Sequence, residues 1–355
     1  MKIVRFILIP LVPVFAFIVK LRNKLFDKEI FKTEAVNAKV ISVGNINIGG
    51  AGKTPLVIFL ANLLKNEKKK VGVLSRGYGR KSKGYLLVSD GKKIFADVEM
   101  CGDEILLTAN ECKVPSAVAE KRIAGAKKLI SDQHVDTIVL DDAFQHRWIK
   151  RDIDLLICEQ RFLISPDFYD HYLLPAGNMR EPFSSIERAS AVIINRKFSQ
   201  PRDIPGSVEK YFTNKQIFNA FYSAKGFVDI KRKTGYNLSE FEGQKSLVVC
   251  GIANPYSFFT ALKQTNVDTE NYLIFRDHKY YTDKEIQQIR KMFYITNSHS
   301  VVTTPKDAVK LSEYHDELDD IDIFYLKIEL MMDDPSSFKF FLLNKLNYTE
   351  DLFNG

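Results

Sequence analysis

The segment with the clearest chemistry is a glycine-rich turn between an apolar run and an amphipathic one. It reads VISVGNINIGGAGKTPLVIFLANLL, residues 40–64, and Gly52-Lys53-Thr54 stands where a helix would begin. In a phosphate loop, backbone N–H groups and a helix N-terminus surround phosphate oxygens, while a lysine contacts the β and γ oxygens. The pattern therefore predicts a nucleotide phosphate site, with Lys53 also acting in catalysis. Its members are Asn47, Ile48, Gly49, Gly50, Ala51, Gly52, Lys53 and Thr54.

This loop departs from the strict G-x-x-x-x-G-K-[ST] pattern at its first position. Asn47 stands where that pattern has glycine, although Gly44, Gly49 and Gly50 surround it. Asparagine tolerates a positive φ better than most residues, so we expect Asn47 to replace the glycine conformationally. The strand predicted before the turn and the helix predicted after it still indicate a phosphate loop.

A pair of carboxylates supplies the second half of such a site. The run Thr137–Leu140 is apolar and ends in Asp141 and Asp142. In open α/β sheets, functional groups collect at the carboxyl ends of strands, so both aspartates should face the phosphates. Together with the Thr54 hydroxyl, one of them would hold Mg²⁺, directly or through water. ATP and Mg²⁺ are thus the expected cofactors, with Thr54, Asp141 and Asp142 as metal ligands.

The elements around these residues alternate between short β-rich runs and helical stretches. Alternation of this kind predicts an α/β fold with a parallel sheet and helices on both faces. Residues 217–236 interrupt the rhythm and read as two strands around a turn near Ala224–Gly226, which would link two domains. We expect a membrane-interface segment at 1–32, a P-loop domain at 33–216, a two-stranded linker at 217–236, a smaller α/β domain at 237–334, and a helix and tail at 335–355.

Charge and composition restrict the class of protein. The 355 residues carry a net charge of +7, and the four cysteines form no C-x-x-C pair, which fits a reducing cytosol. Residues 1–32 carry a local charge of +5 and residues 65–93 a local charge of +8, so the rest of the chain is −6. Basic patches of this kind seek anionic partners: a phosphorylated substrate, a membrane surface or nucleic acid.

The N-terminus contains an apolar run of 14 residues, from Phe6 to Val19, flanked by basic side chains. A spanning helix needs about 20 apolar residues, and Pro10 and Pro13 interrupt this run. No small-residue cleavage site follows it, as a signal peptide would require. We expect an interfacial segment on the cytoplasmic leaflet; a terminal helix buried against the domain is the alternative.

Eight short segments in this order resemble the tetraacyldisaccharide 4′-kinase family, whose members are ATP-dependent enzymes of lipid A biosynthesis at the bacterial inner membrane. They are GNINIGGAGKTP (44–55), LSRGYGR (74–80), GDE (102–104), LDDAFQHR (140–147), LLPAGNMREP (173–182), GIANP (251–255), FRDH (275–278) and TTPKDAVKL (303–311). In the last segment Pro305 replaces the glutamate usual in the family. The resemblance spans roughly residues 1–312.

The resemblance implies an activity and a set of site residues. The γ-phosphoryl group of ATP would move to the 4′-hydroxyl of an acylated, 1-phosphorylated glucosamine disaccharide, giving lipid IVA. Asp103 and His278 match the proposed catalytic dyad of the family, and would deprotonate that hydroxyl. Residues expected to contact the substrate are Arg76, Tyr78, Arg80, Glu104, Gln145, His146, Asn178, Arg180 and Glu181.

Other functions fit the sequence less well. A different P-loop kinase or ATPase with a soluble substrate would not need the apolar N-terminus. A GTPase-like switch would require Asn-Lys-x-Asp, and Asn195-Arg196-Lys197-Phe198 lacks the aspartate. A nucleic-acid site at 65–93 would need more stacking aromatics than Tyr78 and Tyr85. We expect no nucleic acid and no obligate protein partner.

Overall fold

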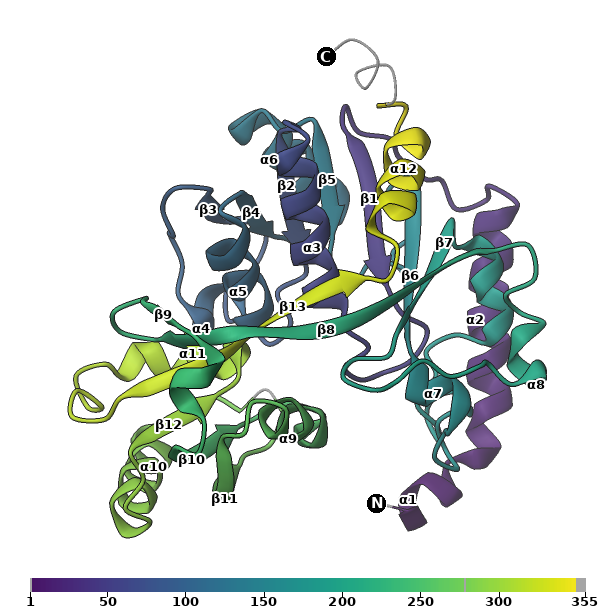
Figure 1. Ribbon diagram of the computed structural model, residues 1–355. Coiled ribbons are helices and arrows are strands. Elements are labelled where there is room, and N and C mark those ends of the chain that lie inside the picture. The colour runs from purple at the N-terminus through teal and green to yellow at the C-terminus, as the bar shows by residue number, and fades with distance from the viewer. Residues whose placement is uncertain (1, 278, 349–355) are drawn as a thin grey trace.

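The computed structural model describes residues 2–277 and 279–348, and its strands join into one sheet (Figure 1). Strand order is β11-β10-β12-β13-β8-β7-β6-β1-β5-β2-β4-β3, and β9 pairs with β8. The strands are β1 (Lys39–Gly44), β2 (Val71–Ser75), β3 (Leu86–Asp90), β4 (Pro115–Val118), β5 (Thr137–Leu140), β6 (Ile153–Glu159), β7 (Ala191–Asn195), β8 (Gln216–Asp229), β9 (Gly235–Tyr236), β10 (Lys245–Cys250), β11 (Asp268–Ile274), β12 (Ser300–Thr303) and β13 (Ile323–Met332). The helices are α1 (Lys2–Ile7), α2 (Val12–Asp27), α3 (Lys53–Asn66), α4 (Val98–Cys101), α5 (Asp103–Cys112), α6 (Arg122–Gln133), α7 (Gln160–Ile164), α8 (Gly206–Glu209), α9 (Pro255–Lys263), α10 (Asp283–Ile295), α11 (Pro305–Leu311) and α12 (Pro335–Lys345).

The first α/β unit is a parallel sheet, as the alternation of apolar runs and helices predicts. Strands β7, β6, β1, β5, β2 and β4 pair in parallel, and β3 adds an antiparallel edge. Side chains alternate across it: Ile41 and Val43 pack toward α3, whereas Val40 and Ile138 pack toward α6. The alternation explains why helices cover both faces, and the predicted fold class is confirmed.

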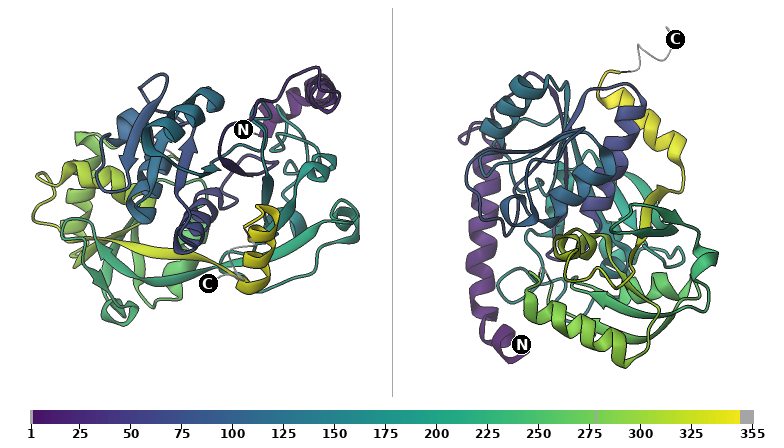
Figure 2. Two further views of the ribbon diagram at one scale, coloured as in Figure 1. Left: turned by 90° about the horizontal axis from the view of Figure 1, so that it is seen from above. Right: turned by 90° about the vertical axis from the view of Figure 1, so that its left-hand side faces the viewer.

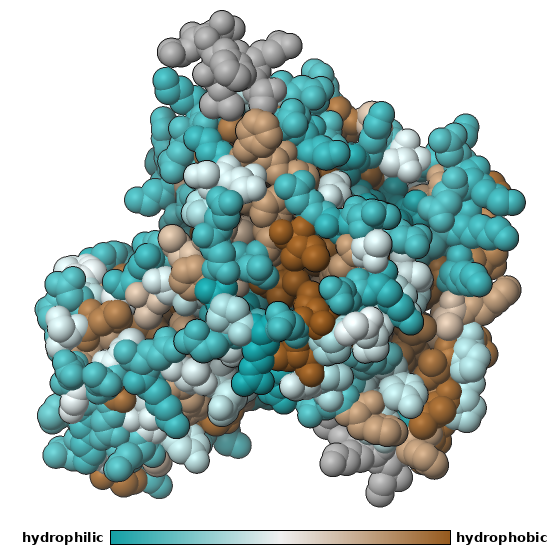
Figure 3. Space-filling model, turned by 45° about the vertical axis from the view of Figure 1, so that its right-hand side comes forward, coloured by the Kyte–Doolittle hydropathy of each residue, from teal (hydrophilic) through white to brown (hydrophobic). Residues whose placement is uncertain are grey.

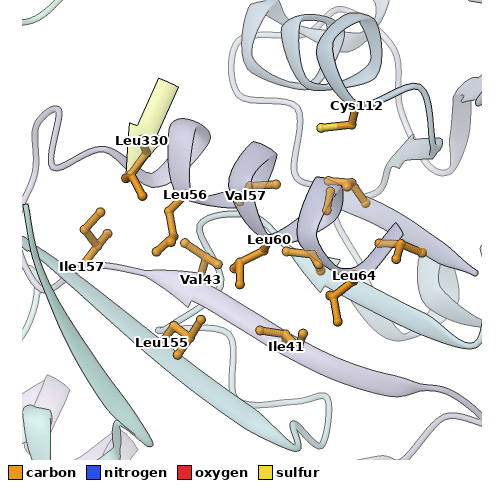
Figure 4. Packing of buried hydrophobic residues seen from close by; sticks show 14 of the residues in the cluster. Ile41, Val43, Leu56, Val57, Leu60, Leu64, Cys112, Leu155, Ile157 and Leu330 are labelled. Carbon is orange, nitrogen blue, oxygen red and sulfur yellow. The ribbon is translucent and has the colours of Figure 1, made fainter. Parts of the chain in front are cut away.

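Helix α3 fills the centre of one face (Figure 4). Leu56, Leu60 and Leu64 recur at helical spacing, are fully buried, and contact residues of β1 and β6. Burying each such leucine contributes roughly 1.5–3 kcal/mol to folding. The packing fixes α3 against β1, so the turn between them, residues 45–52, holds a defined position.

The second unit is joined to the first by two long antiparallel strands. Its strands β11, β10, β12 and β13 are parallel, and β13 then pairs antiparallel with β8 from Phe324, opposite Asp229, to Met332, opposite Ala220. The expected turn near Ala224–Gly226 is wrong: β8 runs unbroken through it, with only a bulge opposite Lys327 and Ile328. Continuous pairing with β13 from Ala220 to Asp229 keeps β8 a single strand, and the second linking strand is β13.

The two ends of the described chain pack on the first unit (Figures 1 and 2). Phe338 of α12 contacts Phe59 and Phe218, with ring centroids 5.9 and 4.9 Å apart, so α12 closes the face that α3 covers. At the N-terminus, α2 runs along the side of the molecule as a separate rod, with only Val19 and Phe26 buried.

Candidate active site

The phosphate loop lies between β1 and α3, and its glycines leave an open cradle. Gly49 and Gly52 have φ values of +118° and +107°, and nothing lies within 4 Å of where a Cβ would stand on Gly49 or Gly50. Asn47 does not adopt a positive φ, so that expectation is wrong; it forms an isolated bridge with Met179 instead. The loop therefore obtains its shape from Gly49 and Gly52, and Asn47 attaches it to a neighbouring segment.

Asp142, the second aspartate after β5, is held by two cations. Arg180 donates to both carboxylate oxygens at 3.0 and 3.1 Å, and Lys53 Nζ lies 3.8 Å away. Although burial opposes its ionisation, Lys53 and Arg180 keep the pKa of Asp142 below its ordinary value. Lys53 also lies 3.5 Å from the Asn45 side-chain oxygen, which Arg180 contacts as well. The cluster is pre-assembled with a surplus of positive charge.

Asp141 is buried and incompletely satisfied. One carboxylate oxygen accepts a 3.4 Å hydrogen bond from Ser75, and the other finds no hydrogen-bond partner among the described residues. Burial, followed by the charges of Glu104 and Asp142, raises the pKa of Asp141 to about 7. An orphaned carboxylate oxygen at a phosphate site fits a divalent cation. Mg²⁺ commonly takes one or two carboxylates and completes its shell with water and phosphate oxygens.

Acidic residues of the first unit meet lysines of the second between α5 and α11. Glu104 pairs with Lys306 at 2.6 Å, and Asp103, only 8% exposed, lies 3.8 Å from Lys310 Nζ. Although burial disfavours its charge, Glu104 and Asp103 hold the pKa of Lys306 above its ordinary value. His278, the predicted partner of Asp103, lies outside the described residues. Nearby, Tyr280 donates a 3.0 Å hydrogen bond to the Gly79 carbonyl.

Lys53, Asp142, Arg180, Glu104 and Lys306 line one cavity of about 1100 Å³ between the two units, whereas Asp103, Asp141 and Lys310 are not among its lining residues. Its lining comes from both units and from the strands that join them, and includes Gly49, Gly50, Lys53, Thr54, Tyr78, Glu104, Asp142, Arg180, Tyr222, Asn254, Asp277, Lys306 and Lys327. The cavity therefore unites the phosphate loop with Tyr78, Glu104 and Arg180 of the predicted substrate set.

The other predicted substrate residues have different surroundings. Arg80 donates hydrogen bonds to the Glu120 carboxylate and to the Gly84 carbonyl, and Gln145 donates to the Asn45 carbonyl at 2.9 Å. Burial, followed by the charges of Arg122, Arg151 and the exposed Arg76, lowers the pKa of His146 to about 4.

Asn178 and Glu181 reach toward the N-terminal helices. Asn178 accepts from Arg5 at 3.0 Å, and the fully buried Glu181 pairs with Arg22 and Arg188 at 3.0 and 2.9 Å. These contacts give Glu181 a role in fixing α2 rather than in lining the cavity.

Two residues near the loop were not identified from the sequence. Asn195, at the end of β7, donates to the Ala51 carbonyl at 3.0 Å, and Lys306 reaches the cavity from α11. A polar residue at the carboxyl end of a strand was the available signal for Asn195. The segment TTPKDAVKL contained Lys306, but nothing in the sequence placed it opposite Glu104.

Comparison with known proteins agrees with this geometry. The family described as tetraacyldisaccharide-1-P 4′-kinase matches residues 4–347. The tetraacyldisaccharide 4′-kinase of Halothermothrix orenii is 35% identical over 331 residues, covering 88% of this chain and 84% of that one. The enzyme of Flavobacterium psychrophilum is 33% identical over 361 residues, covering 99% and 98%. A crystal structure of LpxK from Aquifex aeolicus, described as an "apo" form in complex with ATP, matches with a TM-score of 0.80 at 30% identity and covers 97% of this chain and 99% of that one.

Proposed function

The chain belongs to the tetraacyldisaccharide-1-P 4′-kinase family, and we propose that it performs the family reaction in the cavity between its two α/β units, with ATP as donor. It is an enzyme, a kinase of lipid A biosynthesis that phosphorylates the 4′-hydroxyl of a tetraacyldisaccharide 1-phosphate. The observation that carries the site assignment is the meeting of Lys53, Asp142 and Arg180 with Glu104 of α5 around one cavity.

In this proposal the phosphate loop binds the donor phosphates. Backbone N–H groups of residues 49–54 and the N-terminus of α3 face the phosphate oxygens, and Lys53 contacts the β and γ oxygens. Thr54 and Asp141, with Asp142 beside it, would hold Mg²⁺. Mg²⁺ would neutralise charge on the transferring phosphoryl group. The unpartnered oxygen of Asp141 supports this assignment.

We further propose that Asp103 is the general base. The 4′-oxygen forms a bond to the γ-phosphorus, the bond from that phosphorus to the β–γ bridging oxygen breaks, and ADP leaves. Asp103 takes the hydroxyl proton, and His278 would orient it. Asp103 is the first residue of α5, nearly buried, and Lys310 lies 3.8 Å from it. Asp103 and the phosphate loop both belong to the first unit, and Asp103 lies where that unit meets α11 of the second.

The exposed side of α1 and α2 supports association with a membrane. Residues Arg5–Asp27 are long and apolar enough to cross a bilayer by length and composition. However, Arg22 binds Glu181, and Arg147 binds both Asp27 and the Asn23 carbonyl, so the helix is held alongside the protein body. We infer that it lies in the cytoplasmic leaflet of the inner membrane without crossing it, next to its lipid substrate.

The decisive assay combines purified protein, γ-labelled ATP, Mg²⁺ and the tetraacyldisaccharide 1-phosphate. We expect a bis-phosphorylated lipid, and chelation of the metal should stop its formation. Label found only in free phosphate, or in a different phosphorylated acceptor, would favour the alternative of another P-loop ATPase or kinase.

The roles within the site are separated by two variants. Asp103→Asn should lower turnover by roughly 10²–10⁴-fold with little change in ATP affinity, because a base acts only on the hydroxyl. Lys53→Ala should damage both ATP binding and turnover. If Asp103→Asn weakened ATP binding as much as Lys53→Ala does, Asp103 would be a nucleotide or metal ligand.

A further inference from the structure

The outward side of α1 and α2 is apolar at one end and basic at the other. Phe6, Ile7 and Phe17 are 68%, 68% and 65% exposed, and the neighbouring Leu11, Val14 and Ile18 exceed 50%. Toward the C-terminal end, Lys20, Lys24 and Lys28 occupy the exposed side. Figure 3 shows the apolar side chains gathered at its lower right, beside the N-terminal end of the chain. A rod with this pattern would place its N-terminal half deepest in a bilayer and its lysines at the headgroups.

A loop from another part of the chain presents aromatic side chains at the same end. This loop, residues 165–172, follows α7 and carries Phe168, which is 71% exposed, and Tyr172, which is 41% exposed. Their rings stack at 5.7 Å, and Phe168 also meets Tyr169 edge to face at 4.9 Å. Exposed neighbouring aromatics, one with a hydroxyl tip, are typical of a surface that enters the bilayer interface.

Direct contacts fix this loop to the apolar half of the helical rod. Arg5 donates to the Asn178 side chain at 3.0 Å, and its guanidinium lies 5.6 Å from the centre of the Tyr169 ring. Asn178 in turn donates to Asp170 at 2.6 Å. The loop and the N-terminal end of the rod therefore form one continuous surface.

We propose that loop 165–172 is a second membrane-contacting element, which enters the surface of a phospholipid bilayer beside the apolar half of α1 and α2. The proposal rests on the membrane association inferred above and adds the element that would set the orientation of the enzyme. The acidic residues of the loop shape it: Asp170 accepts from the Asp167 backbone and from Asn178, while Asp167 pairs with Arg161. Phe168 is the most exposed large apolar side chain of the loop.

The same loop is connected to the phosphate loop by backbone hydrogen bonds. Asn178 N–H donates to the Tyr169 carbonyl at 3.2 Å, and Ile48 N–H donates to the Asn178 carbonyl at 2.7 Å. Arg180, two residues further, reaches Asp142 in the cavity. A lipid whose acyl chains stay in the bilayer at Phe168 could thus present its disaccharide toward Arg180.

The test uses tryptophan as a local reporter of depth. The chain has one tryptophan, Trp148, so each reporter is introduced into a Trp148→Phe background. Phe168→Trp probes the loop, Phe17→Trp probes α2, and Phe340→Trp is a control on α12, 63% exposed at the opposite end of the molecule (Figure 1). Vesicles of phosphatidylethanolamine and phosphatidylglycerol, with and without brominated acyl chains, are added to the full-length protein.

We expect blue-shifted emission and bromine quenching for the reporters at 168 and 17, and no change for the reporter at 340. A response at 17 without one at 168 would overturn this proposal while leaving membrane association intact. No response at either position would show that the membrane association itself is wrong. A blue shift at 168 that depends on protein concentration without vesicles would mean that the surface joins two copies of the chain, and would also overturn the proposal.

An affinity measurement gives a second readout that does not depend on reporters. Phe168→Ser should weaken vesicle binding by roughly tenfold or more, the cost of losing one buried aromatic side chain. Phe340→Ser should leave vesicle binding unchanged, and both variants should retain ATP binding. Equal vesicle affinity in Phe168→Ser and the parent protein would contradict the proposal.

Discussion

Two glycines of the phosphate loop have opposite surroundings, and this makes the cost of a side chain there predictable. A Cβ on Gly52 would lie 2.4 Å from the Asn195 amide nitrogen and 2.6 Å from the Tyr222 hydroxyl, at a φ of +107°. Gly50 has open space around it and lies outside the left-handed region. We expect Gly52→Ala to lower the free energy of unfolding by about 1–3 kcal/mol.

Urea unfolding without nucleotide measures this effect. Gly50→Ala is the matched control and should change the free energy of unfolding by about 0.5 kcal/mol or less. Equal losses in the two variants would mean that the contacts of Gly52 with Asn195 and Tyr222 do not determine the loop.

His146 gives a prediction about pH. Burial, with the charges of Arg122, Arg151 and Arg76, lowers its pKa to about 4, against 6.5 in the unfolded chain. As pH falls below 6.5, the unfolded chain binds a proton that the folded chain does not, so stability is lost toward pH 4. After allowance for partial solvent screening, we expect His146→Gln to remove about 1–2 kcal/mol of this acid-dependent loss.

Urea midpoints are measured at pH 7.5 and at pH 5.0 for the parent protein and for His146→Gln. The loss of stability on acidification is then compared between the two proteins. The two proteins differ only at position 146, so contributions common to both cancel in this comparison. If the two proteins lose the same stability on acidification, His146 is not the group responsible.

At the residue scale, the sequence predicts groups that share a short segment better than groups that meet across the fold. Lys53, Thr54, Asp141 and Asp142 were predicted because strand ends and helix starts dictate their positions. The pairing of Arg180 with Asp142 joins residues 38 positions apart, and Lys306 with Glu104 joins residues 202 apart. Such pairings depend on how the units pack, which periodicity and spacing do not determine.

At the scale of elements, α2 is attached to the body by a buried carboxylate. Glu181 is fully buried between Arg22 and Arg188 and accepts from Asn23 at 2.9 Å. Removing one partner from a buried ion pair costs about 3–5 kcal/mol, because the other partner remains buried without compensation. We expect Glu181→Ala to release α2 and to increase hydrogen exchange across residues 12–27.

Glu34→Ala is the comparison, since Glu34 pairs with Lys127 while both side chains are half exposed. Exposed pairs contribute about 0–1 kcal/mol, so this variant should exchange as the parent protein does. Increased exchange in both variants, or in neither, would show that Glu181 does not hold the helix.

Other elements show where sequence periodicity is sufficient. The apolar runs Val71–Ser75, Thr137–Leu140 and Ala191–Asn195 each form a strand over their whole length, because each is a short apolar run between polar turns. β3 was not predicted; it is an edge strand, buried only in part, so its pattern is weak. The turn expected near Ala224–Gly226 is wrong for a different reason: Gly226, at a φ of +155°, resembles a turn glycine in sequence, but it lies at a bulge inside β8.

On the scale of the whole molecule, the basic stretch at 65–93 divides between two places. Lys68–Lys70 precede β2 and Arg76–Lys83 follow it, so a buried strand of about 17 Å separates them. Lys69 lies 3.9 Å from the centre of the Tyr348 ring, whereas Tyr78 lines the cavity. The residues that follow β2 therefore lie at the phosphate-loop end of the sheet, whereas Lys68–Lys70 lie at the opposite end of this strand.

The position of these charges predicts how salt separates two kinds of binding. Lys20, Lys24 and Lys28 are exposed on the rod, whereas the Lys53 side chain is 14% exposed in the cavity. The Debye screening length falls from about 10 Å at 0.1 M salt to about 3 Å at 1 M. Added salt therefore weakens mainly the interactions of exposed charges. Raising salt from about 0.05 M to 0.5 M should lower binding to anionic vesicles roughly tenfold or more, since each surface lysine contributes about 1 kcal/mol. ATP affinity, measured by calorimetry in the same buffers, should change by about threefold or less. A variant with Lys20, Lys24 and Lys28 replaced by glutamine should lose most of the salt dependence of vesicle binding. If salt lowered vesicle affinity and ATP affinity by the same factor, the charge of residues 1–32 would serve a partner other than the membrane.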